Sequence, residues 1–300
     1  MPRQDTIFER FLAPFFRTFL IDEPALRRLK AEINWPQETQ RFERVDLTYP
    51  DYYRTAAFHG IAGGYLTADA AVTYDPITQH VLPPGEAIVR QALIDAIRVK
   101  SPQRILDLGC GTGSMTLLLK QTFPDAEVVG VDLSPYMLVM ADRKAQQAQQ
   151  TITWLHADAA HTGLNPQSFD LVTAALLFHE TPPAITQAIL REGYRLLKVG
   201  GEFLILDGNQ QTLRLTPWLM DIFEEPYIRD YADGSLDADM GRFGFGAVQT
   251  TPFWWMHQVT RGVKPIMTTS GYANDVAAWT PGDRKLEKEH GPGDWVPVPI

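Results

Sequence analysis

Cysteine is almost missing from this chain of 300 residues, which contains only Cys110. One thiol cannot form an internal disulfide, and it cannot supply the several thiolates of a cysteine-based zinc site. We therefore expect no disulfide framework and no metal site. A chain without disulfides is typical of a reducing compartment, so the predicted location is cytoplasmic.

Long apolar runs and an excess of positive charge are missing as well. The longest apolar stretch, residues 171–178, is far shorter than the roughly 20 residues of a membrane-spanning helix. Lys and Arg total 27 against 36 Asp and Glu, so a net charge of -9 provides no positive field for a phosphate backbone. Charged residues interrupt the first twenty positions, which argues against a secretory signal. We expect neither a membrane span nor a nucleic-acid partner.

The composition changes twice along the chain. Residues 1–84 are rich in aromatic residues and proline, with apolar residues at helical spacing, and they predict a helical extension that acts as a lid. Residues 85–263 alternate short apolar runs with segments of helical period and form the predicted main domain. Residues 264–300 carry glycine, proline and a run of charges, which predicts a loosely structured tail.

The alternation in residues 85–263 predicts an α/β fold with a mostly parallel sheet flanked by helices. Residues 247–253 and 255–263 are expected to close the sheet as an antiparallel pair. Thr181 is expected to cap a helix that follows it. The remaining predicted elements are strands at residues 104–108, 127–131, 152–156, 170–176 and 202–206, and helices at residues 114–122, 134–149 and 182–197.

Three glycines, Gly109, Gly111 and Gly113, follow the first predicted strand, where turns without side chains let a ligand approach the backbone. Their G-x-G-x-G spacing is one residue tighter than the dinucleotide fingerprint G-x-G-x-x-G, which favours a ligand without a pyrophosphate. Asp107 can face an ammonium group at the strand end. Asp132, at the end of the second strand, can accept hydrogen bonds from both hydroxyls of a ribose.

Further along the chain, Asp158 lies in WLHADA, and the runs SFDLVTAALLFHE and LLKVGGEFLILDG follow in turn. In order and spacing, these segments and the glycine loop resemble the successive motifs of class I S-adenosylmethionine-dependent methyltransferases. The resemblance extends from about Ile88 to Val263. It implies a Rossmann-like seven-stranded sheet with a reversed last strand, and S-adenosyl-L-methionine as the cofactor.

The resemblance also implies how the cofactor is bound. Its methionine part would lie over the glycine loop, its ribose at Asp132, its adenine between Leu133 and Asp158, and its sulfonium near Leu176. Asp158 has an alternative role as a helix cap. The expected cofactor-binding residues are Asp107, Gly109, Gly111, Thr112, Gly113, Asp132, Leu133, Asp158, Ala159 and Leu176.

His179 and Glu180 are the candidate catalytic residues, because they follow the fourth strand at the edge where α/β sheets place ligands. A neutral His179 can take a proton from the acceptor as the methyl group arrives, with Glu180 holding its orientation. The alternative is a hydrogen bond that only shapes the pocket. Methyl transfer from a sulfonium often needs only proximity and alignment.

Aromatic side chains in residues 51–76 are interleaved with turn-forming glycines, which is typical of a lid or pocket wall. The alternative is that these aromatics only pack the extension onto the sheet. Trp218, Trp254 and Trp255 are expected in the core or in a pocket wall. The candidate substrate-binding residues are Tyr53, His59, Tyr65 and Tyr74.

The predicted function is direct methyl transfer to an oxygen, carbon or nitrogen of a small apolar or aromatic metabolite. The chain is similar to the broad group that contains ubiquinone and menaquinone methyltransferases, but this similarity does not identify the substrate. A protein methyltransferase and a non-catalytic cofactor-binding subunit are the alternatives. The glycine spacing and Asp107 argue against a nicotinamide oxidoreductase. The sequence identifies neither the methylated atom nor the oligomeric state.

Overall fold

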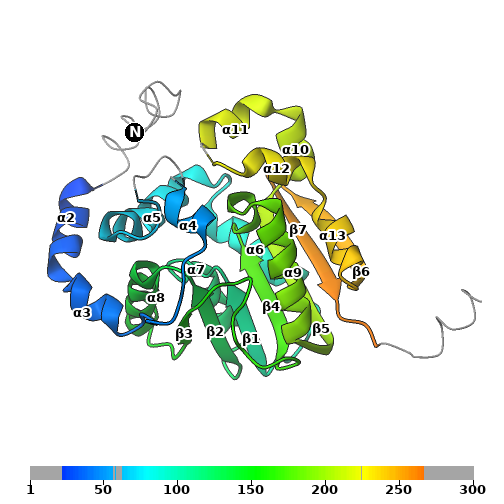
Figure 1. The fold of residues 1–300 in the computed structure, drawn as a ribbon, viewed down its shortest axis with the longest axis horizontal. Coiled ribbons are helices and arrows are strands. Elements are labelled where there is room, and N and C mark those ends of the chain that lie inside the picture. Colours follow the sequence, from blue (N-terminus) through cyan, green and yellow to red (C-terminus); the bar gives the residue numbers. More distant parts are fainter. Residues whose placement is uncertain (1–21, 57, 59–62, 224, 267–300) are drawn as a thin grey trace, which may run out of the picture. The chain divides into compact units, whose positions relative to one another are not determined.

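The computed structural model describes residues 22–56, 58, 63–223 and 225–266. In this part of the chain, seven strands form one sheet in the order β3-β2-β1-β4-β5-β7-β6 (Figure 1). The first five strands pair in parallel, and β7 is antiparallel to β5 and β6. The predicted Rossmann-like sheet is therefore confirmed. Its strands are β1 (Arg104–Leu108), β2 (Glu127–Asp132), β3 (Thr153–His156), β4 (Phe169–Ala175), β5 (Leu197–Gly208), β6 (Gly246–Phe253) and β7 (His257–Val263).

Side chains of β1 alternate between two layers of helices. Ile105 packs in a cluster with α6 (Glu86–Ala96) and α7 (Ser114–Thr122), whereas Leu106 packs in the cluster that includes α9 (Pro183–Leu196). Both faces of the strand are buried, which explains why apolar residues stand on both of them, Ile105 on one and Leu106 and Leu108 on the other. The order of the strands reverses direction between β1 and β4, and this switch point marks the edge where a ligand site is expected.

The start of α9 differs from the prediction. Pro182 is the N-cap residue and Pro183 the first helical residue, so the cap predicted at Thr181 is wrong because Thr181 lies one residue too early. Its hydroxyl instead donates to the carbonyl of Phe178 at 3.1 Å and contacts the Thr186 hydroxyl at 2.7 Å. Thr181 thereby ties the turn after β4 to the first turn of α9.

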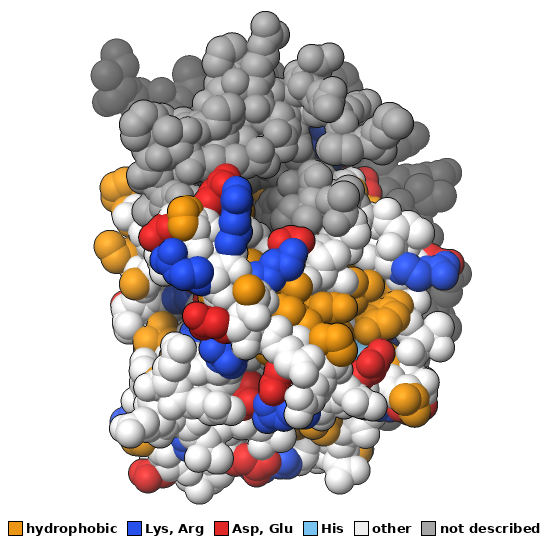
Figure 2. Space-filling view, turned by 90° about the vertical axis from the view of Figure 1, so that its left-hand side faces the viewer, with side chains coloured by type: hydrophobic (Ala, Val, Ile, Leu, Met, Phe, Trp, Pro, Cys, Tyr) orange, Lys and Arg blue, Asp and Glu red, His pale blue; other side chains and the backbone are white. Residues whose placement is uncertain are grey.

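The described part of the extension is helical and carries an aromatic cluster, as predicted. Tyr53, Phe58 and Tyr65 are buried in one cluster with Leu133 and Met137 of the main domain. Figure 2, seen from the side of α2 and α3, shows hydrophobic side chains gathered on this face among charged ones. The helices are α2 (Glu23–Glu32), α3 (Trp35–Gln40), α4 (Asp51–Thr55) and α5 (Ala68–Val81). Of these, α3 and α5 contact α8 (Pro135–Gln147) of the main domain, and α2 contacts α5.

Four short helices between β5 and β6 were not predicted: α10 (Gln210–Leu215), α11 (Pro217–Phe223), α12 (Ile228–Asp233) and α13 (Leu236–Arg242). The three tryptophans expected in the core or a pocket wall are exposed by 55% at Trp218, 56% at Trp254 and 47% at Trp255, so that prediction is wrong. Trp254 and Trp255 lie in the turn between the two strands of the closing hairpin, which points them away from the core.

None of the helices in the described residues has the length and apolar character needed to cross a membrane. The tail predicted to be loosely structured lies outside the described residues from position 267 onward. The boundary between extension and main domain at residues 84 and 85 stays a prediction.

Candidate active site

A pocket lies at the carboxyl edge of the parallel strands, around the switch point between β1 and β4. Counted out to its mouth and including open solvent, its empty volume is about 630 Å³. Its lining comes from the ends of four strands, from α8 and α9, and from the extension. The lining residues are Tyr52, Tyr53, Phe58, Tyr65, Tyr74, Gly109, Gly111, Asp132, Leu133, Met137, Ala157, Asp158, Ala159, Leu176, Leu177, Glu180, Thr181 and Ile189.

The glycine loop supplies two of these residues, Gly109 and Gly111, both with a positive φ that favours glycine. A Cβ at Gly109 would lie 2.7 Å from the Leu177 side chain, whereas a Cβ at Gly111 would meet nothing within 4 Å. The backbone of Gly111 therefore faces open space. Gly113 does not line the pocket, and a Cβ there would lie 2.7 Å from Trp154, so it serves the packing of the loop.

Asp132 is buried at the end of β2, where its two carboxylate oxygens each accept one backbone hydrogen bond. The donors are the N–H groups of Gly111 and Ser134, both at 2.8 Å. Burial raises the pKa of Asp132 to about 6, although these two hydrogen bonds act in the opposite direction. Since a carboxylate has about four acceptor positions, Asp132 can accept further hydrogen bonds from a ligand in the pocket.

Asp107 does not line the pocket, although it lies just before the glycine loop. It is 1% exposed, and its carboxylate accepts hydrogen bonds from the hydroxyls of Thr116 at 2.6 Å and Thr173 at 2.7 Å. Burial raises its pKa. In this arrangement Asp107 links β1 to α7 and β4, and so fixes the start of the glycine loop from behind.

Thr112 is also buried behind the lining, where it connects the glycine loop to the extension. Its hydroxyl donates to the carboxylate of Asp75 at 2.5 Å, and Asp75 forms an ion pair with Lys144 at 2.8 Å. Lys144 donates in turn to the Ser114 hydroxyl at 2.8 Å. No motif marked Asp75 or Lys144 in the sequence, because they lie on different helices, α5 and α8.

The ends of β2 and β3 form another part of the pocket wall. Leu133, Asp158 and Ala159, three of the residues expected to bind the cofactor, all line the pocket here. Asp158 accepts a hydrogen bond from the Ala160 N–H at 2.8 Å, and burial raises its pKa. His156 holds this region together, because its Nε2 donates to the carbonyl of Leu133 at 2.9 Å.

Leu176 directly follows β4 and lines the pocket. Its φ of 60° places a non-glycine residue in the left-handed region, a conformation that costs of order 1–3 kcal/mol and is found most often at functional sites. The Leu176 N–H donates to the carbonyl of Leu206 at 2.8 Å, which holds this turn against β5.

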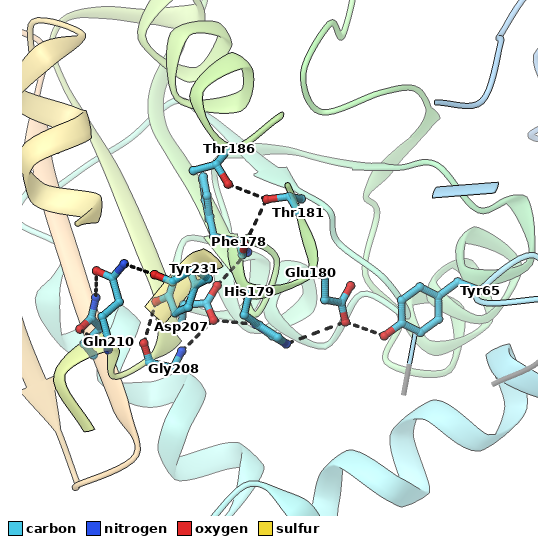
Figure 3. Close-up of polar contacts among 11 residues, drawn as sticks. Tyr65, Phe178, His179, Glu180, Thr181, Thr186, Asp207, Gly208, Gln210 and Tyr231 are labelled. Atoms are coloured by element: carbon cyan, nitrogen blue, oxygen red, sulfur yellow. Dashed lines mark hydrogen bonds and ion pairs between the residues drawn. The ribbon is translucent and has the colours of Figure 1, made fainter. Parts of the chain in front are cut away.

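The turn after β4, Phe178–Glu180, carries both predicted catalytic residues (Figure 3). Asp207, fully buried at the end of β5, accepts a hydrogen bond from the Phe178 N–H at 2.8 Å and lies 2.7 Å from His179 Nδ1. Glu180 lines the pocket, but His179 does not. Asp207 was missed by the sequence analysis, although it ends the apolar run LILDG.

The charges around His179 decide its protonation. Burial lowers its pKa, but the carboxylate of Asp207, with those of Glu180 and Glu225, outweighs this and raises the pKa to about 9. His179 therefore carries a proton on both ring nitrogens at neutral pH. Its Nε2 lies 4.0 Å from Glu180 Oε1, and the same oxygen accepts a hydrogen bond from the Tyr65 hydroxyl at 2.6 Å (Figure 3).

The extension contributes an aromatic wall to the pocket. Tyr53, Tyr65 and Tyr74 line it at the predicted positions, whereas His59 lies outside the described residues. The rings of Phe58 and Tyr65 stack with centroids 5.3 Å apart, and Tyr65 meets Tyr74 edge-on at 5.9 Å. The sequence analysis missed Phe58 and also Tyr52, which lies on the same short helix as Tyr53.

Comparison with known proteins gives three kinds of match. A family model described as "Methyltransferase domain" matches residues 105–201. An uncharacterized methyltransferase of Synechocystis sp. is 35% identical over 173 residues, which cover 55% of this chain and 77% of that protein. Demethylmenaquinone methyltransferase of Thermus thermophilus is 36% identical over 47% of this chain. The match spans 64% of the Thermus protein, so the chain covers less than two thirds of its length.

Among solved structures, a putative O-methyltransferase from Nostoc punctiforme superposes with a TM-score of 0.53. The superposition covers 66% of this chain and 59% of that one, at 17% sequence identity. At this identity the likeness concerns the fold alone, and it agrees with the strand order described above.

Proposed function

Because the chain belongs to the class I S-adenosylmethionine-dependent methyltransferases, whose cofactor is S-adenosyl-L-methionine, we propose that it methylates a small apolar or aromatic molecule. The methyl group would go directly to an oxygen, carbon or nitrogen atom of that molecule. The observation that carries the proposal is the pocket, which combines the glycine loop and Asp132 with an aromatic wall. A reducing cytoplasmic compartment belongs to the same proposal, supported by the single free thiol of Cys110.

The residues around the pocket fit the cofactor. The backbone of Gly111 faces open space, so the methionine part can approach the loop closely. Asp132 keeps acceptor positions for the ribose hydroxyls. We assign the adenine to Leu133, Asp158 and Ala159. Asp107, Thr112 and Gly113 would support the loop from behind, while Gly109 would lie under the methionine part and Leu176 near the sulfonium.

When bound, the cofactor supplies a methyl group activated by a sulfonium. The chain itself would align the acceptor against the aromatic wall and exclude water. A base must be unprotonated, so the raised pKa of His179 argues against a general-base role at neutral pH. We assign His179 to positioning Glu180, and Glu180 to contact with the acceptor.

Calorimetric titration with S-adenosylmethionine, S-adenosylhomocysteine and NADH tests the cofactor site. We expect both sulfur compounds to bind, NADH not to bind, and Asp132→Asn to weaken binding strongly. Asp95→Asn, the same change on the exposed side of α6, is the matched control. Transfer of a labelled methyl group to aromatic and quinol acceptors then tests turnover. Binding of NADH in place of the sulfur compounds would refute the proposal.

A further inference from the structure

His156, the last residue of β3, is 2% exposed and makes contacts through both of its ring nitrogens. Its Nδ1 accepts a hydrogen bond from the backbone N–H of Arg44 at 3.0 Å. Its Nε2 lies 2.9 Å from the carbonyl of Leu133 and 3.2 Å from the Tyr49 hydroxyl. One buried ring therefore joins the end of β2 to two residues of the extension.

These contacts fix the protonation of the ring. Since the Arg44 N–H donates to Nδ1, that nitrogen carries no proton, and Nε2 carries the proton that it donates to the carbonyl. A proton added to Nδ1 would face the Arg44 N–H and break this hydrogen bond. Burial lowers the pKa of His156, which favours the same neutral form. Of the charges on the extension, Glu43 and Asp46 act to raise this pKa and Arg44 acts to lower it.

The contact with Leu133 reaches the cofactor site through a single peptide group. The Leu133 carbonyl and the Ser134 N–H belong to the same planar unit. That N–H donates to the Asp132 carboxylate at 2.8 Å. A rotation of the peptide that broke its hydrogen bond with His156 would also move the N–H away from Asp132. His156 thereby holds the carboxylate that we assign to the ribose.

The charge of Asp132 responds to this hydrogen bond. Burial raises the pKa of Asp132, and the carboxylates of Glu180 and Asp107 act in the same direction. The N–H groups of Ser134 and Gly111 act to lower it. Loss of the Ser134 hydrogen bond therefore disfavours the charged form, which is the form that accepts hydrogen bonds from ribose hydroxyls.

On its other side, His156 fixes the part of the extension that leads to the aromatic wall. The Tyr49 ring lies 5.7 Å from the imidazole ring and stacks on Tyr53 with centroids 6.4 Å apart. Tyr53 lines the pocket. The same imidazole thus contacts the segment that carries the cofactor wall and the segment that leads to the acceptor wall.

We propose that neutral His156 is a positioning residue of this enzyme: it orients Asp132 through the peptide between Leu133 and Ser134, and it holds residues 44–49 of the extension. The inference rests on the proposed function and adds to it a residue outside the pocket lining.

Two substitutions separate the two ring nitrogens. An amide can donate or accept a hydrogen bond, and it stands near the place of Nε2 in glutamine and near that of Nδ1 in asparagine. His156→Gln should keep the bond to Leu133 and bind S-adenosylhomocysteine within about twofold of the unmodified protein. His156→Asn should keep only the bond to Arg44 and bind at least about fivefold more weakly at neutral pH. Equal affinities in the two variants would overturn the proposal.

The pH profile of binding distinguishes the orientation of Asp132 from general packing. The pKa of Asp132 is about 6 in the unmodified protein. Because His156→Asn weakens the Ser134 hydrogen bond, this pKa should rise, and affinity should begin to fall at a higher pH than in the unmodified protein or in His156→Gln. A profile shared by all three proteins would show that His156 only packs the wall, and would refute its positioning role.

NMR of the free, unmodified protein reads the ring without any variant. At pH 7 the ring nitrogens of His156 should show a bare Nδ1 and a protonated Nε2. The Arg44 amide should be protected from hydrogen exchange at pH 7. It should lose this protection, relative to an unstructured peptide at the same pH, as His156 takes up a proton in acid. The opposite tautomer, or an unprotected Arg44 amide at pH 7, would contradict the proposal even if both variants failed to fold.

These experiments separate this inference from the proposed function. Binding of S-adenosylhomocysteine to the unmodified protein is measured first, and urea unfolding checks that each variant is folded. If the compound binds and the two variants behave alike, only the further inference fails. If it does not bind, the proposed function fails, and the ring tautomer with the pKa of Asp132 in the two variants, both read by NMR, still decides the role of His156.

Discussion

His179 Nδ1 lies 2.7 Å from the buried carboxylate of Asp207, and this pair anchors the turn that carries Glu180 into the pocket. Asp207 also accepts hydrogen bonds from the N–H groups of Phe178 and Gly208. One carboxylate thus fixes both the backbone of the turn and the imidazole ring. The arrangement explains why Glu180 has a defined place beside Tyr65.

The His179 pair makes the stability of the protein depend on pH. The pKa of His179 is about 9 in the folded protein, against an ordinary value of 6.5. Because the folded pKa is raised, the stabilisation is fully present below about pH 6.5 and is lost as the pH rises through 9. The loss is at most about 3 kcal/mol. Urea unfolding between pH 6 and pH 10 measures it.

His179→Gln should flatten this pH dependence, since glutamine does not titrate. The imidazole of His179 should also titrate near pH 9 in an NMR experiment, and Asp207→Asn should lower that pKa. An imidazole that titrates near its ordinary value in the unmodified protein would contradict this account of the turn.

Cofactor affinity should fall in mildly acidic solution because of Asp132. Its pKa is about 6 in the free protein. Ribose hydroxyls that donate to the carboxylate favour its charged form, so binding lowers the pKa and affinity weakens as the pH falls through 6. Between pH 7 and pH 5 we expect about a tenfold rise in Kd. Calorimetry at both values checks this. The Asp132→Asn variant should bind the cofactor weakly at both pH values, and its Kd should not show a comparable rise between pH 7 and pH 5.

Much of the cofactor side was predictable because its signals are local. Gly109 and Gly111 lie within a few residues of a strand end, and Asp132 ends the next strand. Strand ends in a parallel sheet meet at one edge, so their order in sequence already indicates a shared site. The positive φ of both glycines, and the packing of Leu177 against Gly109, give the physical reason for that pattern.

The acceptor side was less predictable because it depends on contacts between distant segments. Asp207 lies 28 residues after His179, and Tyr65 lies 115 residues before Glu180. No local period encodes such pairs. The sequence suggested a catalytic base at His179. The structure places the buried carboxylate of Asp207 beside it, and this carboxylate raises the pKa of His179. The exposure of Trp254 could not be predicted from the sequence either, because it depends on the position of this residue in the turn of a hairpin.

Asp75 should control how firmly the extension is fixed to the glycine loop. Asp75→Asn removes the ion pair with Lys144 and weakens the contact with Thr112. We expect faster hydrogen exchange in α5 and a rise of about fivefold in the Kd of the cofactor. Asp69→Asn is the matched control, because its ion pair with Lys30 lies within the extension. Equal effects of the two changes would show that the link to the loop has no special role.

Gly111→Ala should separate cofactor binding from stability. The φ of Gly111 is 52°, so an alanine there costs about 1–2 kcal/mol in backbone strain. A Cβ would meet no protein atom within 4 Å, but it would point into the open space beside the loop. If the cofactor occupies that space, its affinity falls by more than about tenfold while the protein stays folded.

Gly200→Ala provides the control for this change. Gly200 also has a positive φ, of 81°, and a Cβ there would likewise meet nothing within 4 Å, but the residue lies at the opposite edge of the sheet. Both alanine variants should therefore lose similar stability in urea unfolding, and only Gly111→Ala should lose cofactor affinity. If both variants bind the cofactor equally well, the ligand does not approach the loop at Gly111, and the assignment of the methionine part to this loop is wrong.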